Sequence, residues 1–447
     1  MMLYNKNLET FSNKKEDINN IIKKIKCQNI DGAEISLQKI IGINVKTRYG
    51  KLENIEFHND EILNITIYSK LRRGSASTTD LSKKSINSTL ENALDIAHYS
   101  QPDTFSSMPE EELLAFKARD LDLYHPSTIS VDEIINLTAC AEKVALNFDK
   151  KIINTEGGNF NGYIKIKIFG NTYGMLQDYY TSYYSLSTSV VAEKNNKMEA
   201  DYDYTVSRII DDLKKPEFIG KSCAKRVLRK LSPKKISTMS TPVIFLADIA
   251  TNLFRCLCAA INGKNVYQKS TFLLHSLDKQ IFPEWISIEE KPHILRGIAS
   301  APFDAEGVAT KKNIIVKDGI LKNWLLDSYS AKKLGLKSNG HANGIYNLTI
   351  THKNNNFDQL LKKMNKGLII TELMGQGINI INGNYSKGAA GFWVDNGKIQ
   401  YPVNEFTIAG NLKEMWKNIV SIGNDIENRG SIQCGSVLLS EIYVGGI

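Results

Sequence analysis

Apolar positions along the chain follow two different periods, and the change from one to the other predicts its elements. Isoleucines recur at i, i+3, i+4 and i+7 between positions 18 and 25, which predicts an amphipathic helix over 13–27 with lysines on its solvent side. From Ala33 to Ser77 the period becomes two, as in strands with one buried face, and His58-Asn59-Asp60 is predicted to form a turn. The first part of the chain is therefore predicted to contain a meandering antiparallel sheet.

Two further helices and a second group of strands are predicted for the middle of the chain. The first helix has Ser82 as its candidate cap, and the second begins with Ser130 and Glu133, whose spacing is that of a capping box. Residues 151–206 are then rich in aromatic and β-branched residues. Within them Lys alternates with Ile over 163–169, which is typical of a half-buried strand.

After a boundary near Pro233 and Pro242, the pattern is mostly of short strands separated by glycine turns. The clearest case is a hairpin in which apolar runs at 311–316 and 320–326 flank Asp318-Gly319. This pair supplies the positive φ angles that a two-residue turn requires. Many short strands of this kind predict a closed or strongly curled antiparallel sheet.

These elements together predict an α+β fold. The N-terminal domain combines an antiparallel or mixed sheet with long helices, and the C-terminal domain is mostly antiparallel β, with a curled or barrel-like sheet. The predicted regions are an N-terminal α+β region over 1–125, a central strand-rich region packed with it over 126–235, and a C-terminal domain over 240–447.

Charge and cysteine content narrow the class of protein. The chain has 447 residues and a formal net charge of +8, but its lysines are dispersed, whereas phosphate-binding surfaces cluster their cations and favour arginine. No nucleic-acid partner is therefore predicted. The six cysteines form no C-x-x-C pair, as expected in a reducing compartment. No window suits a membrane span and the N-terminus lacks the pattern of a signal peptide, so a cytoplasmic location without membrane attachment is predicted.

The stretch 302–344 contains the candidate substrate-binding residues, which are Asp304, Glu306 and His341. The two carboxylates lie on a predicted loop beside Gly307, and the histidine lies between two glycines. Carboxylates and an imidazole beside flexible backbone can line a groove. Asp and Gly in such loops also serve turn geometry alone, so both interpretations stay open at this point.

The same stretch resembles the signature of the TldD/PmbA family. The resemblance is carried by Phe303-Asp304-Ala305-Glu306-Gly307, the Lys-Asp-Gly hairpin, Asp327-Ser328-Tyr329-Ser330-Ala331 and Ser338-Asn339-Gly340-His341-Ala342, and it extends from about Ala33 to the C-terminus. The segment 263–274, which reads Gly-Lys-Asn-Val-Tyr-Gln-Lys-Ser-Thr-Phe-Leu-Leu, is more similar to the PmbA branch, also called TldE-type. The family is associated with zinc-dependent proteolysis of small peptides and proteins.

The resemblance also implies where a zinc site would lie. In the TldD branch, the motif H-E-x-x-x-H lies on the helix that precedes the segment matched by 263–274, and a cysteine near the C-terminus is a further ligand. In this chain the two histidine positions fall on Arg255 and Ala260, and the glutamate position falls on Cys256. Cys434 lies in the region of the C-terminal cysteine. The resemblance therefore implies no metal ligand and no bound cofactor in this chain, and its catalytic residues are unknown.

The expected function is that of a PmbA-like subunit in a zinc metalloprotease that degrades or processes small unfolded peptides or proteins. Zinc is expected in a TldD-like partner, with a heterodimer, a homodimer or both as the assembly. Exposed strand edges would bind extended peptides through their backbone. Two alternatives stay open: an active metallopeptidase with atypical ligands, and a non-enzymatic regulatory protein that binds nucleic acid or a DNA enzyme. The chain has no G-x-S-x-G elbow that would indicate a serine hydrolase.

Overall fold

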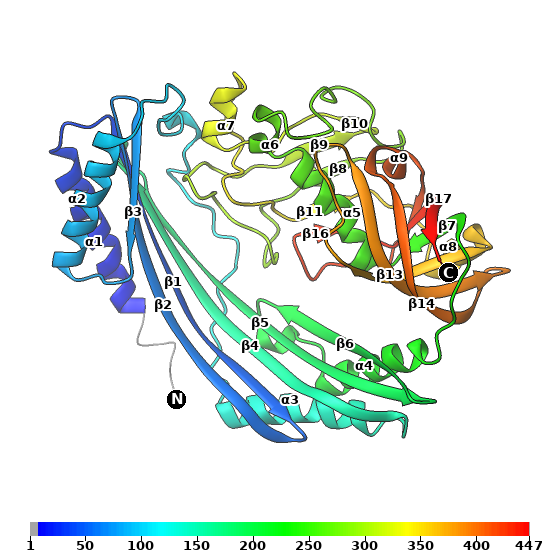
Figure 1. Ribbon diagram of the computed structural model, residues 1–447. Helices are drawn as coiled ribbons and strands as arrows, with labels where there is room; N and C mark the ends of the chain where they lie inside the picture. Colours follow the sequence, from blue (N-terminus) through cyan, green and yellow to red (C-terminus); the bar gives the residue numbers. More distant parts are fainter. Residues whose placement is uncertain (1–7, 447) are drawn as a thin grey trace.

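Two β-rich bodies face each other in the computed structural model, which describes residues 8–446 (Figure 1). The first is a long curved sheet with helices on its outer face. The second contains a closed β-barrel and a smaller sheet. The concave face of the curved sheet is turned toward the second body, so side chains from both bodies meet there. The predicted α+β fold, with a barrel in its C-terminal part, is confirmed.

The curved sheet contains six strands in the order β3-β2-β1-β4-β5-β6, and every neighbouring pair is antiparallel. The bounds are β1 Gly32–Arg48, β2 Lys51–Ser69, β3 Arg72–Thr78, β4 Ile152–Asn171, β5 Leu176–Lys194 and β6 Lys197–Ser207. Because β1 pairs with β2 on one side and with β4 on the other, strands that are far apart in the sequence form one continuous sheet. The edges of that sheet are β3 and β6, which are the shortest of its six strands.

The predicted turn at His58-Asn59-Asp60 is wrong. These three residues lie inside β2, where they pair with Gly42, Ile41 and Ile40 of β1. The ladder satisfies their backbone groups, and this tertiary pairing overrides the local turn propensity. The actual turn lies at Tyr49 and Gly50, which have φ values of 51° and 70°.

Four helices cover the outer face of the sheet (Figure 1), namely α1 Leu8–Lys26, α2 Lys83–Tyr99, α3 Val131–Leu146 and α4 Pro216–Lys230. The isoleucines of α1 predicted to face inward, such as Ile18 and Ile25, are buried in one core with apolar residues of β1 and β4. Both predicted caps are confirmed. Ser82 accepts from the backbone N–H of Ser85, and Ser130 and Glu133 form a capping box at the start of α3.

The second body is organised around a ring of five strands. β7 Met239–Phe245, β12 Gly367–Met374, β13 Asn384–Asp395, β14 Lys398–Asn411 and β17 Val437–Gly445 pair in turn, and β14 also pairs with β17, which closes the barrel. β15 Ile419–Ile422 extends it beside β17. Only the β7–β12 pair of this ring is parallel, so the mostly antiparallel character that the sequence predicts is confirmed.

A smaller five-stranded sheet and short helices complete the second body. Its strands are β8 Ile288–Glu290, β9 Asn313–Lys317, β10 Ile320–Leu321, β11 Leu348–Ile350 and β16 Ile432–Gln433. The helices are α5 Ala247–Ala260, α6 Gly263–Tyr267, α7 Ser328–Lys333, α8 Phe357–Met364 and α9 Leu412–Lys417. The β9–β10 hairpin turns at Asp318 and Gly319, with φ values of 50° and 77° as predicted, although β10 ends well before position 326.

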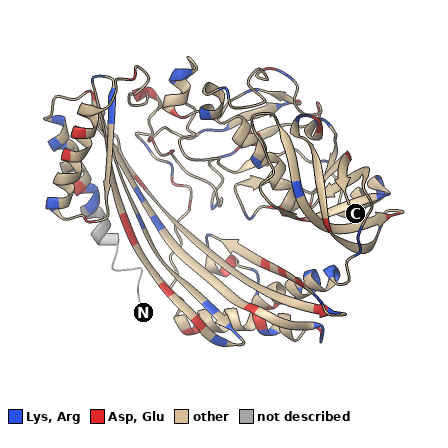
Figure 2. Cartoon of the chain, viewed as in Figure 1, with Lys and Arg blue, Asp and Glu red and all other residues tan. Residues whose placement is uncertain are grey.

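Among residues 8–446, no helix is both long enough and apolar enough to cross a membrane. Figure 2 shows the Lys and Arg positions and the Asp and Glu positions scattered over both bodies. The net positive charge is therefore spread over the molecule in that view, as the dispersed lysines of the sequence predict.

Candidate functional site

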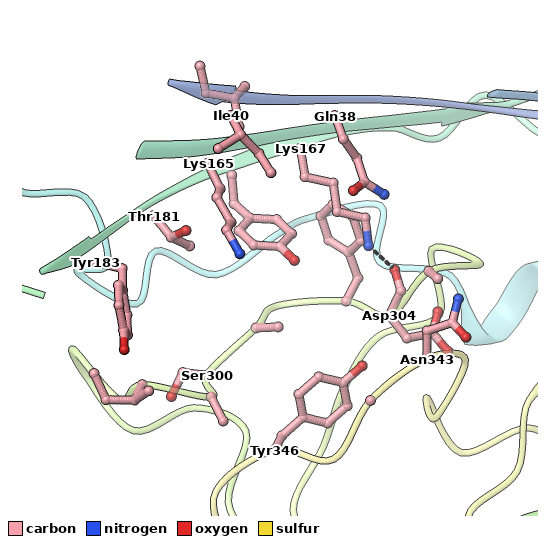
Figure 3. Close-up of a pocket in the computed structure, with 18 of the residues that line it drawn as sticks. Gln38, Ile40, Lys165, Lys167, Thr181, Tyr183, Ser300, Asp304, Asn343 and Tyr346 are labelled. Carbon is pink, nitrogen blue, oxygen red and sulfur yellow. Dashed lines mark hydrogen bonds between the residues drawn. The ribbon is translucent and has the colours of Figure 1, made fainter. Parts of the chain in front are cut away.

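A cavity of about 820 Å³ lies between the concave face of the curved sheet and the loops of the second body. Side chains of β1, β4 and β5 form one wall, and residues 298–301, 303–305 and 342–346 form the other. Figure 3 shows Lys165, Lys167 and Tyr183 projecting from the sheet, with Asp304 and Tyr346 opposite them. The volume is within the usual range of ligand-binding cavities.

The alternation of residues along β4 decides which side chains reach the cavity. Successive residues of a strand point to opposite faces, so Lys165 and Lys167 share the concave face. Ile164 and Ile168 point the other way, into the apolar core beneath the helices. The half-buried strand predicted from the Lys–Ile alternation thus supplies the basic residues of the cavity.

Asp304 lines the cavity but uses its carboxylate to shape a loop. Its side chain is 1% exposed and accepts backbone N–H groups of Glu306 and Val308 at 2.9 Å and of Ala342 at 3.0 Å. Burial raises the pKa of Asp304, while these three donors oppose the rise. The backbone carbonyl of Asp304 accepts from Lys167 Nζ at 2.6 Å, which ties the loop to the sheet (Figure 3).

Glu306 lies outside the cavity lining, at a second contact between the two bodies. Its carboxylate accepts the backbone N–H of Ser328 at 2.9 Å, and burial raises its pKa to about 7. Its electrostatic neighbour on the sheet is Glu34 of β1, which is 8% exposed. Burial, and then the nearby Glu306, raise the pKa of Glu34 to about 8. The sequence analysis missed Glu34, because a single glutamate at a strand start gives no local signal of this contact.

His341 is buried behind the cavity wall. Its Nε2 lies 2.5 Å from Glu290 Oε2 and its Nδ1 lies 2.7 Å from Asn339 Oδ1. Asn339 Oδ1 is an acceptor that also receives the N–H of Leu326, so Nδ1 of His341 donates to it. The other oxygen of Glu290 accepts the N–H of Tyr346 at 2.6 Å. His341 therefore positions the 339–346 loop.

Of the three predicted substrate-binding residues, the structure places only Asp304 on the cavity lining. Their contact with substrate stays a prediction, and the geometry gives His341 and the Asp304 carboxylate positioning roles. Arg208 is a residue that the sequence analysis missed. It donates to the carbonyl oxygens of Ser182 at 2.8 Å, Gly297 at 3.2 Å and Ile298 at 2.6 Å, so it fixes one loop of the cavity wall to the sheet.

The positions at which the family resemblance implies a zinc site lie mainly on α5. Arg255 is exposed, whereas Cys256 is 5% exposed and Ala260 is fully buried. Burial raises the pKa of Cys256 to about 11 and holds that of Cys434 well above its usual value. The guanidinium of Arg255 and the methyl group of Ala260 offer zinc no ligand, so the side chains at these positions do not form a zinc-binding set. Among the described side chains, which are those of residues 14–446, no group of three or more His, Cys, Asp or Glu is placed to hold a metal ion.

Both bodies of the molecule match models of one protein family. Models of the PmbA/TldA metallopeptidase domain 1, central domain and C-terminal domain match residues 33–97, 124–231 and 238–446. The chain belongs to the PmbA/TldD metallopeptidase family. The resemblance found in the sequence is therefore confirmed.

Individual relatives of this family match over most of the chain. Metalloprotease PmbA of Escherichia coli is 58% identical over 416 residues, which are 93% of this chain and 92% of that protein. A metalloprotease PmbA homolog of Buchnera aphidicola is 49% identical over 413 residues, covering 92% and 93% of the two chains. A TldD homolog from the same Buchnera strain is 23% identical over 390 residues, covering 82% of this chain and 74% of its own.

Two solved structures share the architecture. A Bacteroides thetaiotaomicron protein, named as a proposed modulator of DNA gyrase, superposes with a TM-score of 0.91 at 25% identity over the whole of both chains. TldE from Thermococcus kodakarensis superposes with a TM-score of 0.81 at 19% identity, covering 96% of this chain and 100% of its own. The latter likeness shows the fold alone.

Proposed function

We propose that this chain is the PmbA-type subunit of a PmbA/TldD-type zinc metalloprotease that degrades or processes small unfolded peptides or proteins. In this proposal it supplies substrate-binding walls, while a TldD-like partner holds the zinc. The observation that carries the proposal is the composition of α5. It presents Arg255, Cys256 and Ala260 at the positions where the TldD branch has its H-E-x-x-x-H motif.

A zinc peptidase requires protein ligands for the metal, an open position for water and a general base to take the proton of that water. The guanidinium of Arg255 and the methyl group of Ala260 cannot ligate zinc, and Cys256 cannot replace a glutamate as base while its thiol is protonated. Hydrolysis in the assembly is therefore assigned to the partner.

The cavity supports a substrate-binding role for this chain. It combines lysine ammonium groups, tyrosine hydroxyls and loop backbone on facing walls, a mixture that suits the alternating polar and apolar groups of a peptide. The occurrence of a PmbA homolog and a TldD homolog in one Buchnera aphidicola strain supports a division of labour between two related subunits. A heterodimer of two similar folds is the expected assembly, with a homodimer as the state of this chain alone.

A reconstituted cleavage assay tests this proposal. Unfolded peptide is incubated with this chain alone, with the TldD-like subunit alone, and with both, each with zinc and with a chelator. We expect chelator-sensitive cleavage only in mixtures that contain the TldD-like subunit, and faster cleavage when both are present. As a matched pair, the partner's histidine motif is replaced by alanines and Cys434 of this chain is replaced by Ala. Only the first change should abolish cleavage. Robust chelator-sensitive cleavage by this chain alone would refute the division of labour.

A further inference from the structure

The cavity between the two bodies contains an excess of positive charge. It is lined by four basic side chains, Lys39, Lys165, Lys167 and Arg208, and by one carboxylate, that of Asp304. The Asp304 carboxylate is already engaged by three backbone N–H groups. Lys39 is paired with a glutamate of β2 outside the lining. Three cations therefore face the cavity without a carboxylate bound to any of them.

Lys165 is the cation most available to a ligand. Its side chain is exposed and points from β4 into the cavity (Figure 3). It makes no ion pair and no hydrogen bond with any residue of 14–446, the part of the chain whose side chains are described. Because this ammonium is exposed to water, its charge has a small desolvation cost. An anion that binds beside it in a partly enclosed cavity would form a stronger ion pair than one at an open surface.

The two other cations, Lys167 and Arg208, add positive potential to the cavity, but both already donate hydrogen bonds to backbone carbonyl oxygens. Lys167 donates to one carbonyl oxygen and lies over the rings of Phe303 at 5.1 Å and Tyr179 at 5.8 Å. Burial lowers the pKa of Lys167 to about 8, so a bound anion would help to keep it charged. Arg208 is 6% exposed, and its terminal nitrogens are used by backbone carbonyls.

Hydroxyl donors from both walls complete the site. The side chains of Tyr183, on the sheet, and Tyr346, on the opposite loop, both line the cavity (Figure 3). Neither hydroxyl has a hydrogen-bond partner in the part of the chain that the structure describes. Hydrogen bonds from a hydroxyl or ammonium to an ionised oxygen are stronger than those to a neutral one. These donors line the same cavity as the Lys165 ammonium.

We propose that this cavity binds the carboxylate of a peptide, with Lys165 as its ion-pair partner and the hydroxyls of Tyr183 and Tyr346 as further donors. The identification of the ligand as a peptide rests on the proposed function. The carboxylate belongs to the peptide C-terminus or to an acidic side chain, because both present the same group. A phosphate would instead favour a free arginine fork, and the fork of Arg208 is occupied by carbonyl oxygens.

The test measures binding of fluorescent peptides to the full-length chain by anisotropy. Three probes share one N-acetylated sequence: one has a free C-terminal carboxylate, one has a C-terminal amide, and one has the amide and a single internal glutamate. We expect at least one carboxylate probe to bind about tenfold more tightly than the neutral amide, as for a charge-assisted hydrogen bond. The tighter of the two identifies the source of the carboxylate.

Matched variants assign the preference to the cavity. Lys165→Met removes the charge and keeps the stem, and we expect the preference to fall to less than about twofold because the ion pair is lost. Lys165→Arg should restore it. Lys51→Met is the control, since Lys51 is an exposed lysine on β2 outside the cavity lining, and it should leave the preference unchanged.

Three results would overturn the proposal: no binding of any probe, equal binding of acid and amide probes by the unaltered chain, or a full preference in Lys165→Met. Equal binding of acid and amide probes would leave the proposed function standing. The proposed function would be contradicted by a different result, namely the absence of zinc-dependent cleavage when this chain is mixed with the TldD-like subunit.

Discussion

Replacing Glu34 by glutamine removes an ionisable group from the contact between the two bodies while keeping its shape. Glu34 is 8% exposed, one of its oxygens has no hydrogen-bond partner among the described residues, and the other accepts the hydroxyl of Tyr68 at 3.2 Å. Burial, followed by the nearby Glu306, raises its pKa to about 8, and the pKa of Glu306 is raised to about 7. Both carboxyl groups therefore stay protonated in the folded protein at mildly acidic pH.

The direction of the pH effect follows from proton binding. Between the ordinary pKa of 4.5 and the raised value of about 8, the folded state carries a proton on Glu34 that the unfolded state has lost. Stability is therefore highest at low pH within this window and falls as the pH rises, by about 1.4 kcal/mol per pH unit for one group. From pH 6 to pH 8 the loss attributable to Glu34 is about 2 to 3 kcal/mol, with Glu306 adding to it below pH 7.

Thermal unfolding at constant ionic strength measures this effect. The midpoint temperature of thermal unfolding of the unaltered chain should be roughly 3–8 °C lower at pH 8 than at pH 6. Glu34→Gln should lose much less, so its advantage grows with pH. Glu91→Gln, at an exposed position of α2, is the control and should follow the unaltered chain. A constant difference between Glu34→Gln and the unaltered chain across this range would refute the reasoning.

Two further substitutions test the packing that shapes the cavity. Arg208→Lys keeps the charge, but one ammonium cannot reach the carbonyls of Ser182 and of 297–298 together. We expect a loss of about 2–4 kcal/mol and faster hydrogen exchange of the 297–301 amides, whereas unchanged exchange would show that Arg208 does not hold this loop. Gly74→Ala places a Cβ 2.1 Å from the carbonyl oxygen of Ala93 on α2, so the helix must shift, at a cost of about 2–3 kcal/mol by thermal unfolding. Gly50→Ala, in an open turn with φ of 70°, should cost about 1 kcal/mol, and an equal loss for Gly74→Ala would contradict the close approach of α2.

Features set by neighbouring residues could be predicted from the sequence. The Asp318-Gly319 turn and the Ser130–Glu133 capping box depend on backbone angles and hydrogen bonds within a few residues, and both are present. The facing of Lys165 and Lys167 toward one side of β4 follows from the period of two. The closed barrel could be predicted as a class, because many short strands leave few other ways to satisfy their edges.

Features that depend on distant contacts could not be predicted in this way. The sequence His58-Asn59-Asp60 has turn propensity, but pairing with β1 keeps it extended. Glu34 and Glu306, and likewise Arg208 and Gly297, meet only because the curved sheet folds over the second body. The glycines around His341 mark it as a candidate site residue, but its partner Glu290 lies 51 residues away, so the positioning role can be assigned only from the structure.

The zinc content of this chain tests the central claim most directly. The purified chain is equilibrated with zinc, freed of excess metal and analysed alone and after mixing with a TldD-like subunit, with Cys434→Ala as a matched variant. The account predicts that zinc is retained in stoichiometric amount only when the TldD-like subunit is present. Stoichiometric zinc on this chain alone, lost in Cys434→Ala, would contradict it.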